Sequence, residues 1–184
     1  MMATGEPGGP FPARRFFPGG NTGEGFFSYY EHLWQPLEVP ELQRIWMIKG
    51  GPGVGKSTFM ARIAQEVQQR GFAVEYHHCS ADPDSLDGVV IPQLGVALLD
   101  GTAPHVLDPR YPGAVDDVIH LGEFWDETAI RRHKPAIVAL TREYKDCYAT
   151  AYRYLAAAVQ VHDDGRAATA DALDWGAVHH VTWR

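Results

Sequence analysis

Hydrophobic and polar residues follow two kinds of pattern in the first half of this 184-residue chain. Ile45–Ile48 is an unbroken apolar run, which is typical of a central strand covered on both faces. From Lys56 to about Arg70, apolar residues recur every three or four positions and predict an amphipathic helix ending at Gly71, with Phe59, Met60, Ile63, Ala64 and Val67 on its buried face. Phe72–His77 is expected to be a second strand. This strand–helix–strand order favours a parallel α/β sheet.

Elsewhere the pattern predicts few strands. Arg14–Phe17 and Val96–Asp100 have strand character, and Val89–Ile91 is a short apolar run. The segments Phe26–Trp34 and Ala114–Trp125 are expected to be helical. No strand pattern occurs between Ala129 and Gly176, so we expect a sheet of three or four strands.

A different pattern dominates the C-terminal part. Apolar residues recur at alternating spacings of three and four, at Ile137, Leu140, Tyr144, Cys147, Ala151, Tyr154 and Ala158. This predicts a long helix with a packing seam, and we expect the seam to lie in the core or in a helical hairpin rather than in a coiled-coil dimer. Residues 163–177 are the candidate returning helix. The helical part is expected over about residues 113–184.

Composition limits the classes of function. Residues 1–12 are rich in Gly and Pro and are expected to be a disordered tail, and residues 13–184 to be one domain. A formal charge of −7 argues against nucleic-acid and anionic-membrane partners. The sequence has neither a transmembrane run nor a signal-peptide pattern, so we expect a cytoplasmic protein in which both cysteines are reduced.

A glycine-rich motif lies between the first strand and the first long helix. Gly50, Gly55, Lys56 and Ser57 satisfy G-x-x-x-x-G-K-[ST], the phosphate-binding P-loop. Its glycines let successive backbone N–H groups point at an anion, and the helix N-terminus adds a positive dipole. The lysine reaches the β- and γ-phosphates and the serine hydroxyl binds Mg²⁺. The expected phosphate-binding residues are Gly51, Pro52, Gly53, Val54, Gly55, Lys56, Ser57 and Thr58.

A second motif follows at Asp100. Four apolar residues, Val96–Leu99, precede it, as in a Walker B strand whose Asp binds Mg²⁺. We therefore expect Ser57 and Asp100 to hold the metal, although the same pattern also describes a strand that runs into a turn. Lys56 and Asp100 are candidate catalytic residues.

Four further polar features have both a functional and a structural interpretation. The segment His77–Gly88 carries His, Cys and Asp residues, which favour loop capping and substrate contact over a metal site. His105 either binds substrate or caps a turn. Arg131 and Arg132 either close over the γ-phosphate as catalytic cations or form a solvated helix end. Asn21 and Thr22, in the glycine-rich stretch 18–25, belong either to a turn or to a second wall of the ligand site.

Several of these stretches together resemble a poorly characterised family of bacterial P-loop ATPase-like proteins. They are Arg15–Thr22, the P-loop, the run from Glu75 through Val90, and Leu99–His105. Members resemble two P-loop modules in tandem, and the resemblance covers residues 13 to 184. It implies ATP binding, and it implies that this chain corresponds to the first module only, either as a fragment of a longer protein or with its second half encoded separately, so that a second P-loop module is a possible partner. The resemblance does not indicate which substrate the protein acts on.

The sequence thus predicts an α/β P-loop NTPase-like fold with a helical C-terminal part. The first functional hypothesis is a Mg²⁺-dependent ATPase or small-molecule kinase, in which Asp82, Asp84 or Asp87 orients a water or an unknown acceptor. The alternative is a nucleotide-gated binding or regulatory module, with little turnover, that docks a protein partner through the helical seam.

Overall fold

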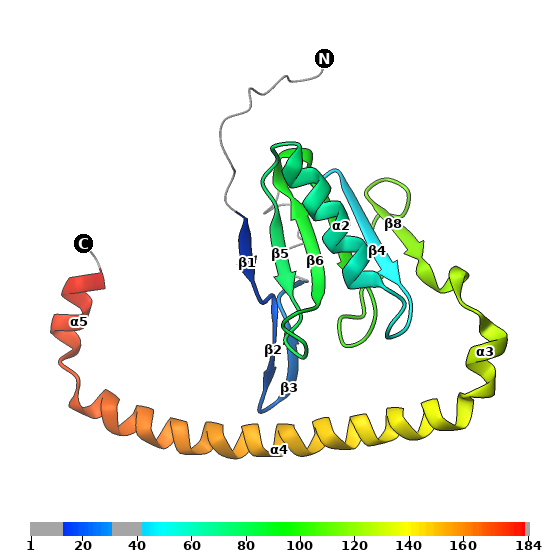
Figure 1. Cartoon of the computed structure of the whole chain (residues 1–184). Helices are drawn as coiled ribbons and strands as arrows, with labels where there is room; N and C mark the ends of the chain where they lie inside the picture. Colours follow the sequence, from blue (N-terminus) through cyan, green and yellow to red (C-terminus); the bar gives the residue numbers. More distant parts are fainter. Residues whose placement is uncertain (1–12, 31–41, 183–184) are drawn as a thin grey trace. The chain divides into compact units, whose positions relative to one another are not determined.

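A computed structural model describes residues 13–30 and 42–182 (Figure 1). Contacts divide these residues into two units. One runs up to Gly20 and from Phe26 to Arg132, and the other contains Asn21–Gly25 and the residues from His133 onward. The predicted tail, residues 1–12, lies outside the described residues.

The first unit is built on a sheet. Within the described residues the sheet has six strands in the order β1-β5-β6-β7-β4-β8. The strands are β1 (Arg14–Phe16), β4 (Arg44–Lys49), β5 (Glu75–His78), β6 (Leu86–Ile91), β7 (Val96–Asp100) and β8 (Asp116–His120). The prediction of three or four strands was therefore wrong.

The sheet is mixed, whereas the sequence predicted a parallel one. β4 is parallel to both β7 and β8, but β6 is antiparallel to β5 and to β7. The reason is the length of the connections. Only the short 3-10 helix η1 (Pro92–Leu94) and Gly95 separate β6 from β7, and parallel neighbours need a crossover of a dozen residues or more.

Helix α2 (Lys56–Gln69) covers one face of the sheet (Figure 1). Met60 and Ala64 on α2 are fully buried against Ile48 and Leu98 of the sheet. The other face carries a smaller cluster that contains Ile45 and Met47. β4 is thus covered on both faces, as its unbroken apolar sequence predicted.

Two predicted helices in the first unit differ from the structure. The segment predicted as a helix over Ala114–Trp125 forms β8 and the 3-10 helix η2 (Leu121–Phe124). The glycine-rich stretch forms the hairpin of β2 (Gly19–Thr22) and β3 (Gly25–Ser28), so the helix predicted from Phe26 does not form over Phe26–Ser28. Residues 31–34 of that prediction lie outside the described residues.

The C-terminal helices differ from the predicted hairpin. After α3 (Glu127–Arg132), helix α4 (Lys134–Ala172) runs for 39 residues without interruption, and α5 (Trp175–Thr182) follows. No residue of α4 is buried. The long helix was correctly predicted, but the seam is not in a core and the returning helix does not form.

Candidate functional site

The glycine-rich loop leaves the sheet at the carboxyl ends of three parallel strands. Ile48 of β4 pairs with Asp100 of β7, and Lys49 pairs with His120 of β8. Gly50–Gly55 then lead directly into α2. Ligands of α/β sheets bind at this edge, because loops and helix N-termini meet there.

The backbone of the loop requires glycine. Gly53 and Gly55 have φ angles of +76° and +94°, in the left-handed region that other residues rarely adopt. Gly55 is the N-cap of α2. The Val54 side chain packs beneath Gly50, where a Cβ would lie 2.7 Å from Val54 Cγ1. The loop is therefore held in one curled conformation ahead of the helix.

Lys56, the first residue of α2, is drawn back over this loop. Its Nζ donates hydrogen bonds to the carbonyl oxygens of Gly50, at 2.8 Å, and of Gly51, at 3.2 Å. The same Nζ lies 3.4 Å from Asp100 Oδ2, and both side chains are mostly buried. The structure thus brings together the lysine and the aspartate that two separate motifs predicted.

A neighbouring residue orients Asp100. The backbone N–H and the hydroxyl of Thr102 both donate to Asp100 Oδ1. The carboxylate therefore presents its other oxygen, Oδ2, to Lys56. Thr102 was not a predicted site residue, and its two-residue distance from Asp100 is the sequence signal for this turn.

The next two helix residues differ in their surroundings. Ser57 Oγ accepts a hydrogen bond from Leu86 N–H at 3.0 Å, and Thr58 is exposed. A hydroxyl has two lone pairs, so Ser57 retains one acceptor site beside the contact with β6. Pro52 is exposed on the loop.

Sequence reasoning missed the wall formed by the residues after β8. A Cβ on Gly51 would lie 2.8 Å from the Trp125 ring, and one on Gly50 would lie 3.6 Å from Leu121 Cβ. This segment is beside the loop because β8 pairs with β4. Trp125 therefore packs on the glycine-rich loop from the side of β8.

The predicted catalytic arginines are exposed on α3. Arg131 pairs with Glu127 at 2.7 Å, one turn earlier, and this surface ion pair adds little stability. No contact joins Arg131 or Arg132 to Lys56 or Asp100 among the described residues. The structure thus does not bring these arginines to the loop.

The polar segment after β5 mostly stabilises its own turn. Asp82 accepts a hydrogen bond from the Ser85 hydroxyl, and its carbonyl accepts one from Ser85 N–H. His78 Nδ1 lies 2.7 Å from the Pro83 carbonyl oxygen. Asp84 is exposed. Loop capping, one of the two interpretations of this segment, is what these contacts provide.

Asp87 has a different environment because it occupies a β-bulge. His77 pairs with Gly88 and His78 with Leu86, so Asp87 is the extra residue. Its carboxylate lies 2.8 Å from His105 Nε2 in a buried pair. His105 Nδ1 is 3.2 Å from Ser28 Oγ. His105 thus connects β6, β3 and the loop after β7, instead of only capping a turn.

His77 and Tyr30 lie against this pair. A Cβ on Gly88 would lie 2.8 Å from the Tyr30 hydroxyl oxygen and 3.2 Å from His77 Nδ1. Burial lowers the pKa of His77 to about 4, although the charge of Asp87 opposes the shift. Burial, followed by the charge of Asp87, raises the pKa of Tyr30. Both side chains are therefore neutral at physiological pH.

Among residues 13–30 and 42–182, no three His, Cys, Asp or Glu side chains are grouped so as to hold a metal ion. Cys79 and Cys147 are free thiols, and burial raises the pKa of Cys79. None of the helices in these ranges is long and apolar enough to span a bilayer.

A family model matches part of the chain. The family model for the N-terminal region of nephrocystin 3 matches residues 21–89, which is less than half of the chain. This segment includes the glycine-rich loop, α2 and β5. No curated protein and no solved structure matches the chain. The resemblance to bacterial tandem P-loop proteins stays a prediction.

Proposed function

We propose that this chain is a P-loop protein that binds ATP with Mg²⁺ at the loop Gly50–Thr58 and acts as an ATPase or as a kinase of a small molecule. One observation carries the proposal. The Lys56 ammonium lies 3.4 Å from Asp100 while it hydrogen-bonds to the Gly50 and Gly51 carbonyl oxygens. The cation and the carboxylate that such chemistry requires thus lie next to each other, mostly buried, at the end of a glycine-rich loop.

The residues present fit a metal–nucleotide complex. The left-handed glycines Gly53 and Gly55 hold the loop curled at the N-terminus of α2, where a helix attracts phosphate. Ser57 Oγ and Asp100 Oδ2 are oxygen donors of the kind Mg²⁺ prefers. Mg²⁺ would supply neutralisation of phosphate charge. Phosphate oxygens would replace the two loop carbonyls as acceptors for the Lys56 ammonium.

The test is ATP binding in the presence of Mg²⁺. For Lys56→Ala we expect affinity to fall at least tenfold, because the phosphates lose their buried cation. Lys145→Ala is the matched control, since this lysine is exposed on α4. Equal affinity of the native protein and Lys56→Ala would overturn the proposal.

A second candidate is a nucleotide-gated regulatory module with slow turnover. The observation that favours it is that Arg131, a predicted catalytic cation, pairs with Glu127 on the surface of α3 and makes no contact with Asp100 among the described residues. Phosphate release, measured with and without a mixture of cell metabolites, separates the candidates. A native rate no higher than that of Lys56→Ala, with ATP still bound by the native protein, selects the regulatory module.

A further inference from the structure

Helix α4 carries an exposed apolar seam that continues beyond the predicted one. The alternating spacing of three and four extends past Ala158 to Val161, Gly165, Ala168 and Ala172. These positions span the helix in a heptad pattern, and every one of them is exposed. The large members of this seam, Ile137, Leu140, Tyr144, Tyr154 and Val161, are 44% to 76% exposed. In water, an apolar seam of this length is normally covered by another part of the protein or by a partner.

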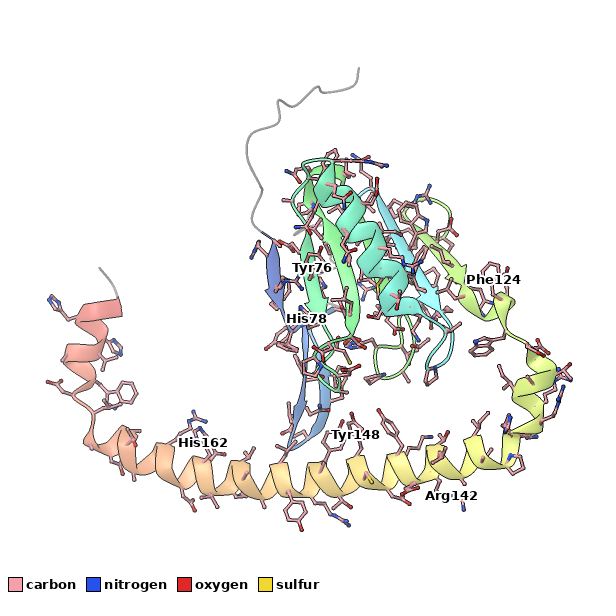
Figure 2. All side chains as sticks on the ribbon, viewed as in Figure 1. Tyr76, His78, Phe124, Arg142, Tyr148 and His162 are labelled. Carbon is pink, nitrogen blue, oxygen red and sulfur yellow. The ribbon has the colours of Figure 1, made fainter. Side chains whose placement is uncertain are left out.

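The chain itself offers no helix of matching length within its described residues. α4 continues through the residues predicted as a returning helix, and α5 has only 8 residues against the 39 of α4. Figure 2 shows side chains projecting along the whole of α4, with Arg142 and Tyr148 on opposite sides. The described part of the chain therefore supplies no second helix that could cover the whole seam.

The side chains along the seam change in size from one end to the other. The N-terminal end has the bulky Ile137, Leu140 and Tyr144, whereas the C-terminal end, beyond Val161, has Gly165, Ala168 and Ala172. A Cβ on Gly165 would meet no atom within 4 Å, so there is open space at this position. Two copies side by side in the same direction would leave gaps between small residues. Two copies in opposite directions can place Ile137 and Leu140 against the partner's Ala168 and the partner's Gly165.

The net charge of α4 also differs between its two ends. Residues 134–153 have a net charge of +2, from Lys134, Arg142, Lys145 and Arg153 against Glu143 and Asp146. Residues 154–172 have a net charge of −2, from Arg166 against Asp163, Asp164 and Asp171. Antiparallel pairing of two copies brings opposite charges together, and parallel pairing brings like charges together.

We propose that α4 pairs with α4 of a second copy of this chain as an antiparallel coiled coil. The pairing that sets Ala151 opposite the partner's Tyr154 also packs Leu140 on the partner's Gly165. In this register Cys147, which is exposed, lies opposite the partner's Ala158. This proposal does not depend on nucleotide binding.

The first test is oligomeric state and its sensitivity to one seam position. Sedimentation equilibrium of the full chain should give twice the monomer mass of 20.4 kDa. Ala151→Glu should weaken the dimer at least tenfold, because it places a charge in the seam. Ala149→Glu, the same change two residues away on the outer face, should not. A monomer at every concentration, or a dimer insensitive to Ala151→Glu, would overturn the proposal.

The second test is direction. In a Cys79→Ser background, Ala158→Cys should allow an oxidant to link Cys147 of each copy to the new thiol of the other. A linkage within one helix is excluded, because the two positions are about 16 Å apart along its axis. Covalent dimers that form through Cys147 alone, without the Ala158→Cys change, would indicate parallel helices and overturn the antiparallel arrangement.

Discussion

At the scale of single residues, the burial of His77 makes folding stability depend on pH. Its side chain is 1% exposed, and both ring nitrogens lack a hydrogen-bond partner among the described residues. The pKa of about 4 in the folded chain lies below the ordinary value of 6.5. Between these pH values the unfolded chain binds a proton at His77 that the folded chain does not. The contribution of His77 to folding stability therefore falls as the pH drops from about 6.5 to about 4.

We predict that His77→Phe removes this part of the pH dependence, which amounts to about 3 kcal/mol at most. Phenylalanine keeps an aromatic ring against Phe16 without a group that titrates. Urea unfolding of both proteins at pH 7 and pH 4.5 measures the difference. The control is His133→Phe, an exposed histidine without a side-chain capping bond. The explanation fails if native protein and His77→Phe lose equal stability on acidification.

At the scale of elements, the sequence correctly predicted the strands and helices that have a distinct hydrophobic pattern within their own residues. β4 and α2 follow from an apolar run and a periodic face, and Asp100 was placed correctly at the end of β7. β8 was missed because it is an edge strand whose Val118 is 42% exposed. Its pairing with β4 is a contact distant in sequence, which periodicity does not encode.

The arrangement of residues in the candidate site, like the fold, was predictable only in part. Lys56 and Asp100 meet because their motifs describe strand ends that lie at the same sheet edge. Trp125 was not predicted to border the loop, because its position depends on β8. The bulge at Asp87 was equally hidden, since it arises from pairing between β5 and β6. What the sequence missed depends on strand pairing, not on residue type.

The loop itself gives a prediction at this scale. Gly55→Ala should weaken Mg²⁺-ATP binding about tenfold, because a φ of +94° strains any residue with a Cβ by about 1–2 kcal/mol. Space is not the cause, since a Cβ at this position would meet no atom within 4 Å. Gly20→Ala is the matched control, with equal space and no positive φ. Equal ATP affinity of native protein and Gly55→Ala, in isothermal titration, would show that the loop conformation is not required.

At the scale of the whole molecule, the stabilising clusters and the candidate site fall in one unit. The residues of both buried clusters, together with Lys56 and Asp100, precede His133. α4 contributes no buried residue. Hydrophobic burial, the main source of folding stability, is therefore concentrated in the part of the chain that ends at Arg132.

We accordingly predict that a chain ending at Arg132 folds by itself. Its melting temperature, followed by circular dichroism, should lie within about 4 °C of that of the full chain. Its affinity for Mg²⁺-ATP should change less than threefold, because the loop and Asp100 are retained. Its sedimentation should be that of a monomer, because α4 is absent. An unfolded truncated chain would mean that the C-terminal helices stabilise the sheet, whereas a folded dimer would place the contact between copies outside α4.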